Sequence, residues 1–584
     1  MKFLRNLFAS IFGTLIAIGL LFLIIVLIAS AFGETKKVEV KSNSVLTINL
    51  KSVVKDFAPK SSNPLDDLFE MNNRKLGLNK ILNAIENAGY DDKIKGVSIS
   101  TLGVSAGVAQ MQAIRNKLLE FKETGKFIYT YADMYDQKSY YLSSVADSVF
   151  INPRGLVNFK GLATEILYYK DFENKFGVKY EVIRHGKYKS AVEPYLANKM
   201  SENNKEQITS FLKSIWDELI IDISKSRNIS TSKLNNIADN LLGRNANLAK
   251  ENNLIDGIIY ADEYENKLKK AVDISLDETL NNVSLADYIT TGKGRIRSSA
   301  SSKIAVIYAQ GEIIYGKGDE EHIGQDLIID ALKKARKSTN TKAIVLRVNS
   351  PGGSALTSDL IWREIELTKK QIPVVVSMGN VAASGGYYIS CNADKIIAEP
   401  TTITGSIGVF GMIPNVSELA NKLGINAEQV KTNKSPSYSV FEPISSEFQK
   451  VTKEGVEAVY TTFVGKVAKG RNLSVATVDS IAQGRVWTGV QAVNNGLVDK
   501  LGNLHDAVVE AAGLAGITDY GIRNYPSYHI DFEDKFSNLP FVKSKEKLLI
   551  EEFGQTNYRI FKNLKSITNT KGIQARLPFV LTIN

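Results

Sequence analysis

The sequence predicts an α/β protein built from two tandem copies of one unit, preceded by a single membrane-spanning helix. Three observations support this prediction: a long apolar run near the N-terminus, apolar β-rich runs that alternate with amphipathic helical patterns, and ordered matches between the two halves of the chain. The 584 residues suffice for more than one domain, and 44% hydrophobic and 23% charged residues are ordinary for folded protein.

The charge balance and the cysteine count exclude some function classes. Lys plus Arg number 72 against 62 Asp plus Glu, but the excess of +10 is spread along the chain and does not indicate nucleic-acid binding. Cys391 is the single cysteine, so an intrachain disulfide and a cysteine-based metal site are excluded.

The apolar run covers residues 11–28, and uncharged flanks extend it over 7–33, which is long enough to cross a bilayer as a helix. Lys2 and Arg5 precede it, which favours a cytoplasmic N-terminus and an extracytoplasmic bulk. A cleaved signal peptide is the alternative, because Ala29-Ser30-Ala31 fits a cleavage pattern; the length of the run favours an uncleaved anchor. We therefore assign residues 1–33 to a cytoplasmic N-terminus and a transmembrane anchor.

The internal repeat has a period of about 241–249 residues, too long for a solenoid. Ordered matches include Tyr387-Tyr388-Ile389-Ser390 with Tyr140-Tyr141-Leu142-Ser143, and Ala393-Asp394 with Ala146-Asp147. The polar stretch 290–302 is the candidate linker. The predicted domains are a first repeat over 34–295, a second repeat over 303–519, and a C-terminal tail over 520–584 whose role the sequence does not indicate.

The second repeat contains half of a catalytic site. An apolar strand over 343–348 leads into Asn349-Ser350-Pro351-Gly352-Gly353-Ser354, a helix follows over 358–367, and a strand over 373–378 leads to Ala382-Ala383-Ser384-Gly385-Gly386-Tyr387. Parallel strands would bring a glycine turn with free N–H groups and Ser384 to the same sheet edge, as an acyl-transfer nucleophile beside an oxyanion hole requires. Alone, the first motif could be an ordinary β–α turn and the second a helix start capped by serine. Ala382 stands where a G-x-S-x-G elbow would have glycine, which disfavours an α/β-hydrolase.

The first repeat supplies the missing base. Projecting Ser384 back by 247 residues reaches Gln137, so the first repeat lacks the nucleophile. It contains Lys189 before a Glu-Pro pair, and the aligned residue of the second repeat is Tyr438. These reciprocal losses predict a site assembled across the repeats. A lysine acts as a base only when neutral, and burial lowers its pKa. The competing bases, disfavoured by their context, are His185, His322, His505 and His529.

Four motifs carry a resemblance to a known family: VLRVNSPGGS, GNVAASGGYYIS, TGSIGVFG and KYKSAVEP. Over residues 38–514 the chain resembles the signal peptide peptidase A (protease IV) family in its long, two-repeat, membrane-anchored form, with a fold of the ClpP/crotonase superfamily. The resemblance implies Ser384 as nucleophile, Lys189 as general base and acid, and Ser406 as the group that orients the lysine. It also implies an oxyanion hole from the N–H groups of Gly353 and Gly385.

The same resemblance implies a serine endopeptidase that hydrolyses hydrophobic peptides, including cleaved signal peptides, without a metal or organic cofactor. It further implies homotetramers on a bacterial inner membrane, in contact with lipid and with the catalytic domain in the periplasm. Two alternatives remain from the sequence: an acyl-CoA thioester-processing enzyme of the crotonase type, and a catalytically silent membrane scaffold.

Overall fold

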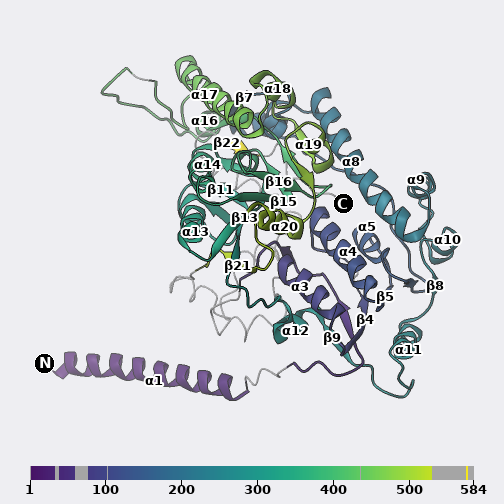
Figure 1. The fold of residues 1–584 in the computed structure, drawn as a ribbon. Coiled ribbons are helices and arrows are strands. Elements are labelled where there is room, and N and C mark those ends of the chain that lie inside the picture. Colours follow the sequence, from purple (N-terminus) through teal and green to yellow (C-terminus); the bar gives the residue numbers. More distant parts are fainter. Residues whose placement is uncertain are drawn as a thin grey trace.

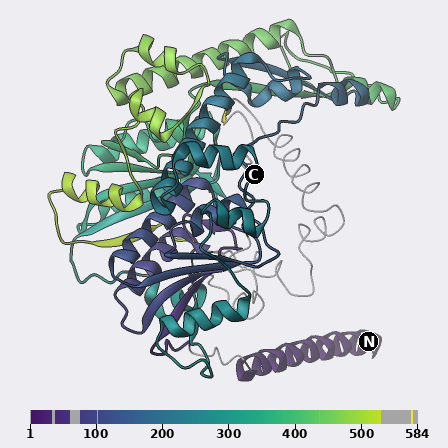
Figure 2. The ribbon, with the colours of Figure 1, turned by 90° about the vertical axis from the view of Figure 1, so that its right-hand side faces the viewer.

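The computed structural model describes residues 2–32, 38–59, 76–100, 103–434, 436–528 and 574–576 (Figure 1). Its first element is helix α1 (Lys2–Phe32), which lies clear of the sheets in both ribbon views (Figure 2). The window Arg5–Phe22 has a mean hydropathy of 1.7 and is not buried by the rest of the chain, so by length and composition it could cross a membrane. Gly33, His529 and most of the predicted tail lie outside the described residues.

The first repeat forms a parallel sheet in the order β8 (Gly257–Ile258), β6 (Ser148–Ile151), β5 (Phe127–Ala132), β4 (Ile94–Ile99), β1 (Ser44–Ile48) and β9 (Asn282–Ser284). Five of the six residues of β4 are buried, as expected for a strand covered on both faces. Helices α3 (Leu78–Gly89) and α4 (Val108–Glu123) contribute their apolar residues to the core of this repeat.

The second repeat forms a separate sheet of the same topology. Its parallel strands follow the order β20 (Lys500–Leu501), β16 (Lys395–Ala398), β15 (Val374–Ala383), β13 (Thr341–Ser350), β10 (Lys303–Gln310) and β21 (Gly521–Tyr525). Strand β15 also pairs with β17 (Ile403–Gly405), which pairs with β19 (Val486–Thr488). Strand β21 lies beyond residue 519, in the predicted tail of unassigned role, and takes the place that β9 has in the first sheet.

The duplication extends to helix caps and buried hydrogen bonds. Helices α8 (Glu202–Arg227) and α17 (Ser446–Arg471) each have 26 residues, an N-cap serine and a left-handed C-cap asparagine. The Tyr140 hydroxyl donates to the Leu254 carbonyl at 2.9 Å, and Tyr387 donates to Leu497 at 2.8 Å. The tandem α/β units predicted from the repeat are therefore present.

A third sheet joins the two repeats. Its order is β12 (His322–Gly324), β11 (Glu312–Ile314), β14 (Gly352–Ser354), β22 (Gln574–Arg576), β18 (Val409–Asn415) and β7 (Lys179–His185). Strand β7 belongs to the first repeat and runs antiparallel to β18 of the second, from the pair Val409 and His185 to the pair Asn415 and Lys179. This pairing carries the chain that follows β7 onto the second repeat.

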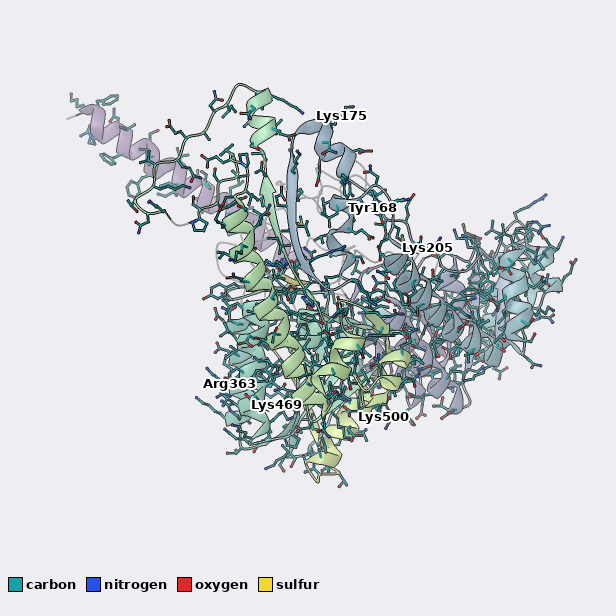
Figure 3. The ribbon with its side chains drawn as sticks, turned by 90° about the horizontal axis from the view of Figure 1, so that it is seen from above. Tyr168, Lys175, Lys205, Arg363, Lys469 and Lys500 are labelled. Carbon is teal, nitrogen blue, oxygen red and sulfur yellow. The ribbon has the colours of Figure 1, made fainter. Side chains whose placement is uncertain are left out.

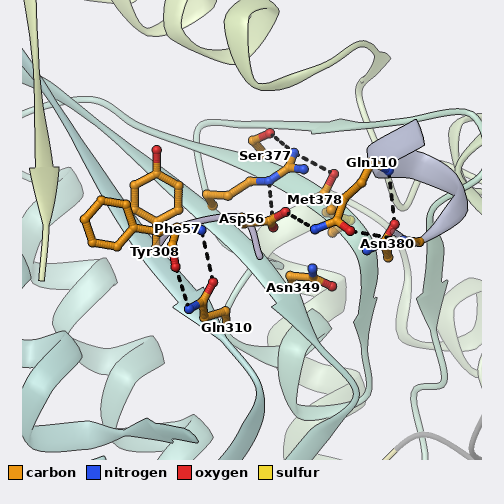
Figure 4. A network of polar contacts seen from close by, with 12 residues as sticks. Asp56, Phe57, Gln110, Tyr308, Gln310, Asn349, Ser377, Met378 and Asn380 are labelled. Carbon is orange, nitrogen blue, oxygen red and sulfur yellow. Dashed lines mark hydrogen bonds and ion pairs between the residues drawn. The ribbon is translucent and has the colours of Figure 1, made fainter. Parts of the chain in front are cut away.

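A buried polar network also connects the repeats (Figure 4). Arg347 Nε lies 3.1 Å from Asp56 Oδ2, and both side chains are 1% exposed. Arg347 Nη1 donates to Ser377 Oγ and to the Met378 carbonyl, while Gln110 Nε2 donates to Asp56 Oδ1. Asp56 and Gln110 come from the first repeat and the others from the second, so the network fixes how the two units meet.

The remaining elements surround these sheets. They are β2 (Val54–Lys55), β3 (Leu76–Gly77), α5 (Gln137–Ser143), α6 (Lys170–Phe176), η1 (Ser190–Val192), α7 (Glu193–Leu196), α9 (Thr231–Asp239), α10 (Ala246–Glu251), α11 (Ala261–Ala271), α12 (Leu285–Tyr288), η2 (Ile289–Lys293), α13 (Gln325–Lys337), α14 (Ala355–Lys369), α15 (Gly385–Tyr388), α16 (Ser417–Lys422), α18 (Val475–Ile481), α19 (Gly489–Asn494) and α20 (Leu504–Leu514). In the view from above, four of the labelled basic side chains come from helices of the two repeats: Lys175, Lys205, Arg363 and Lys469 (Figure 3).

Candidate active site

Ser384 lies at the carboxyl end of β15, where the strand turns into the short helix α15. Its φ of 56° and ψ of −115° are unusual for a residue other than glycine. The Ser384 amide donates to the Gly405 carbonyl at 2.8 Å, and the Ser384 carbonyl accepts from the Tyr388 amide at 2.8 Å. Strained backbone that its surroundings hold in place is common at catalytic residues.

Ser406 follows the neighbouring strand β17. Because β15 and β17 are parallel and Ala383 pairs with Gly405, the next residue of each strand, Ser384 and Ser406, reaches the same sheet edge. Ser406 also has a positive φ, 51°, and its amide donates to the Arg485 carbonyl at 2.7 Å. Two serines in uncommon backbone conformations thus stand side by side.

Lys189 comes from the loop after β7. The loop is hydrogen-bonded to the second repeat, because the Tyr188 amide donates to the Gln483 carbonyl at 2.9 Å. The same loop is hydrogen-bonded to helix α8 of the first repeat. Gln207 Nε2 of α8 donates to the Tyr188 carbonyl at 3.1 Å and to Ser190 Oγ at 2.9 Å. The lysine is therefore held from both sides.

The structure brings Lys189, Ser384 and Ser406 together. Lys189 Nζ lies 2.8 Å from Ser384 Oγ, 3.0 Å from Ser406 Oγ and 3.3 Å from the Ser406 carbonyl oxygen. All three residues have 0% exposure. Burial lowers the pKa of Lys189 well below its ordinary value, because the charged ammonium loses its water.

This arrangement has the parts of a nucleophile and its base. A neutral Lys189 can accept the Ser384 hydroxyl proton through its lone pair while its own N–H groups donate to Ser406 oxygens. The fixed distance to two Ser406 oxygens limits the directions in which the lone pair can point. The role that the resemblance gave to Ser406 is compatible with this geometry.

The glycine turn lies beside Ser384. Gly352 has a φ of 95° and Gly353 a φ of 153°. A Cβ placed on Gly352 would lie 2.7 Å from the Gly385 amide nitrogen, so any side chain at Gly352 would collide with the backbone after the nucleophile. The glycine turn therefore packs against Gly385, the residue after Ser384, and the role of Gly353 and Gly385 in holding an oxyanion stays a prediction.

None of the histidines within the described residues is bonded to Ser384. His185 Nδ1 lies 2.7 Å from Glu457 Oε2, and its ring stacks on Tyr460 with centroids 3.7 Å apart. His322 pairs with Asp319, and His505 lies exposed on α20. The geometry favours lysine over these histidines as the base.

At the position of the first repeat that is equivalent to Ser384, Gln137 takes the place of the serine. Gln137 Nε2 donates to the Gly161 carbonyl at 2.9 Å, and Gln137 Oε1 accepts from the Lys160 and Gly161 amides. A cavity of about 330 Å³ lies here, lined in part by Gln137 and Lys138. The Gln137 side chain therefore stabilises, through hydrogen bonds, the loop that contains Lys160 and Gly161.

Sequence reasoning missed two glycines that shape the lysine's surroundings. A Cβ on Gly484 would lie 2.6 Å from Lys189 Cβ, and one on Gly408 would lie 3.2 Å from Lys189 Cδ. Gly484-Arg485 repeats Gly243-Arg244 of the first copy, which was a signal of importance but gave no indication of contact with Lys189.

Comparisons with known proteins show which family the chain is similar to. The model of "Peptidase family S49" matches residues 120–275 and 366–518, and that of "Clp protease" matches 296–404. The chain is 36% identical to "Protease 4" of Haemophilus influenzae, over 88% of this chain and 85% of that protein. It is 34% identical to "Protease 4" of Salmonella typhi, over 87% and 85%. It is 31% identical to "Serine protease SPPA, chloroplastic" of Arabidopsis thaliana, over 93% and 78%.

Proposed function

The chain belongs to peptidase family S49 and is a serine protease, and on that premise we propose that it cuts peptides with a dyad of Ser384 and Lys189. The observation that carries this proposal is the 2.8 Å contact between Lys189 Nζ and Ser384 Oγ, with both groups fully buried. A buried lysine with a lowered pKa is the form of lysine that can take a proton near neutral pH.

In the proposed mechanism, neutral Lys189 takes the hydroxyl proton as Ser384 Oγ attacks the substrate carbonyl carbon. The negative oxygen of the tetrahedral intermediate accepts from the N–H groups of Gly353 and Gly385, and each such donor stabilises it by about 3–4 kcal/mol in comparable sites. Protonated Lys189 then donates to the leaving amine, and the C–N bond breaks. Water, deprotonated by Lys189, hydrolyses the remaining ester and frees Ser384.

Replacing either dyad residue tests the proposal. Ser384→Ala and Lys189→Ala should each lower kcat on a hydrophobic peptide by on the order of 10⁴–10⁶-fold, because nucleophile and base act as one unit. Lys187→Ala is the matched control, since Lys187 lies in the same loop and is exposed. Turnover at the wild-type rate in either dyad variant, with folding intact, contradicts the dyad.

The substrates we propose are hydrophobic peptides, including signal peptides left in a membrane after cleavage. Support comes from the apolar helix α1, which would hold the enzyme at a bilayer where such peptides are. We further propose that α1 is an uncleaved anchor in a bacterial inner membrane, with Lys2 and Arg5 on the cytoplasmic side and the catalytic repeats in the periplasm. Assembly into homotetramers on the membrane stays a prediction.

The family match disfavours both alternatives taken from the sequence. A crotonase-type enzyme would act on acyl-CoA thioesters, and a silent scaffold would need none of the dyad geometry. The membership in a peptidase family and the contact between Lys189 and Ser384 both favour peptide hydrolysis.

A further inference from the structure

The cavity of about 330 Å³ in the first repeat corresponds in position to the candidate catalytic site of the second repeat. An offset of 247 residues relates the two, since it carries the start of β4 to the start of β13 and the start of α4 to the start of α14. At this offset Lys138 corresponds to Gly385, and Ala106 corresponds to Gly353. The cavity wall therefore contains, in Lys138, the first-repeat counterpart of a residue expected to form the oxyanion hole.

Lys138 is a partly buried lysine with few close partners in the described part of the chain. Its Nζ donates to the Ala106 carbonyl at 3.4 Å, which is longer than a usual hydrogen bond. Burial lowers the pKa of Lys138, and the charge of Asp136 offsets this effect only in part. An ammonium group has three N–H donors, so most of the hydrogen-bonding capacity of Lys138 is left for water or a ligand.

The rest of the cavity wall is mainly apolar. Six apolar or aromatic side chains line it: Val104, Val108, Met111, Tyr141, Leu162 and Leu219. The charged side chains of the wall are Lys138, Lys160 and Asp136, so positive charge is in excess. Asp136 is already bonded, since its Oδ1 accepts from the Ser139 amide at the start of α5. Such a wall suits a ligand with an apolar body and one negatively charged group.

Hydrogen bonds hold the helices around the cavity in place. The Tyr141 hydroxyl of α5 donates to Asp222 Oδ2 of α8 at 2.6 Å. Arg115 Nη2 of α4 donates to the Asp222 carbonyl at 2.8 Å and to Ser226 Oγ at 2.6 Å. Gln137 holds the loop after β6, as described above. The cavity is thus largely preformed, and its volume lies within the range of small-ligand sites, about 300–1,000 Å³.

The position of Lys138 indicates which negative group the cavity suits. In the second repeat the N–H groups of Gly353 and Gly385 are expected to stabilise an oxyanion that forms only during a reaction. In the first repeat Gln137 stands in place of the nucleophile, so no such oxyanion forms, and a full positive charge stands in place of one N–H group. A permanent carboxylate suits that charge. In a peptide the terminal carboxylate carbon is the counterpart of a scissile carbonyl carbon.

We propose that the first repeat binds the C-terminal end of apolar peptides, with the terminal carboxylate at Lys138 and the last side chain in the apolar part of the cavity. The chain belongs to a peptidase family, and hydrolysis of a peptide bond leaves a new C-terminal carboxylate on one product. Such ends therefore arise where this enzyme works. The proposal goes beyond the proposed function, since this site binds without cutting and needs neither Ser384 nor Lys189.

Peptide binding to the full-length Ser384→Ala protein in detergent tests the proposal, because this protein lacks the proposed nucleophile. The probes are two fluorescein-labelled peptides of the sequence Ala-Leu-Ala-Leu-Ala-Leu, one ending in a carboxylate and the other in a carboxamide. Fluorescence anisotropy should give a Kd about tenfold or more lower for the carboxylate peptide, because the carboxamide has no charge to pair with Lys138. Equal Kd values for the two peptides would overturn the proposal.

Further variants in the same Ser384→Ala background place the binding in the cavity. Lys138→Met should abolish the preference for the carboxylate peptide, and Lys138→Arg, which keeps the charge, should retain it. Lys250→Met is the matched control, since Lys250 is exposed on α10, and should change neither Kd. A preference that survives Lys138→Met in full would mean that the carboxylate binds elsewhere.

The apolar part of the cavity is tested separately. Leu162→Trp fills part of the space at a half-buried position and should weaken binding of the carboxylate peptide by about tenfold or more, with folding checked by thermal unfolding. Unchanged binding in a folded Leu162→Trp protein would exclude the cavity as the site. Decanoate is the competing carboxylate: if it displaces the peptide at equal concentration, the cavity takes fatty carboxylates and the peptide is overturned as its occupant.

Discussion

Lys189 is a buried lysine without a carboxylate among its hydrogen-bond partners. The bonds of its Nζ go to oxygens of Ser384 and Ser406, and burial is the cause of its lowered pKa. The folded state therefore releases this proton at a lower pH than the unfolded chain does. Each unit of pKa difference lowers the stability by about 1.4 kcal/mol at pH values below the lowered pKa, so the burial that suits Lys189 to its proposed role as base destabilises the fold.

This cost predicts a stability effect that depends on pH. The unfolded state binds one more proton between the lowered pKa of Lys189 and its ordinary value near 10.5, so wild-type stability rises with pH in that window. Lys189→Met, similar in volume and never charged, should raise Tm at pH 7, and the gain should shrink as the pH approaches 10. Thermal unfolding at both pH values, with Lys187→Met as control, measures this. A gain equal at both pH values would mean that Lys189 keeps its proton in the folded state.

At the scale of elements, the site depends on close packing between the loop that contains Lys189 and the turn that contains Gly484. Gly484, with a φ of 80°, touches the backbone of Lys189, whose loop is carried to the second repeat by β7. The turn before β19 and the loop after β7 therefore fix each other, although they are almost 300 residues apart in sequence.

Gly484→Ala should displace Lys189 and lower kcat by about 100-fold or more, since misplacement by about 1 Å has effects of that size. Gly424→Ala is the matched control: Gly424 also has a positive φ, 74°, but a Cβ there meets nothing within 4 Å. Both variants lose similar stability through the backbone, about 1 kcal/mol. Steady-state kinetics and thermal unfolding separate the effects, and equal kcat values in the two variants would contradict the packing argument.

The ion pair between Asp56 and Arg347 is the element-scale contact whose loss should affect folding most. Asp56→Ala leaves a buried guanidinium without its carboxylate and should destabilise the protein by about 3–5 kcal/mol. Asp217→Ala breaks the exposed pair with Lys213 and should change stability by less than about 1 kcal/mol. Thermal unfolding compares the two, and a shift in Tm as small for Asp56→Ala as for Asp217→Ala would show that the buried pair stabilises little.

The sequence predicted the strands and helices that show a hydrophobic period or a match between the two repeats. It did not predict strands that pair with sheet edges far away in the sequence. The parallel strands beside Ser384 have apolar runs, which predicted them. The first repeat has Gln137 in place of the serine and the second has Tyr438 in place of the lysine, and these two losses predicted one site built from both repeats. Ser406 required the family resemblance, since a serine in a glycine-rich turn has no distinguishing pattern. Strands β21 and β22 lay in a tail without a repeat partner, and the pairing of β22 depends on a gap between β14 and β18 that exists only after the repeats have packed.

At the scale of the whole molecule, the two repeats are joined through contacts that do not involve the connecting chain. Strand β7 pairs with β18, Asp56 pairs with Arg347, and helix α8 bonds to the β19 region, where Ser214 Oγ lies 2.8 Å from Thr488 Oγ1. The predicted linker over 290–302 contains an exposed stretch over 295–299. These contacts, rather than the covalent link, should hold Lys189 at Ser384.

Cutting the linker tests this. A site for a specific protease inserted between Arg297 and Ser298 leaves intact the bonds from Asn87 Nδ2 to the Lys293 and Arg295 carbonyls. After the cut, the two fragments should elute together from a sizing column in detergent and keep peptidase activity within about twofold, because the strand pairing and the buried ion pair between the repeats remain. The uncut insertion protein is the control. Fragments that separate and lose activity, when the control is active, would mean that the linker itself maintains the composite site.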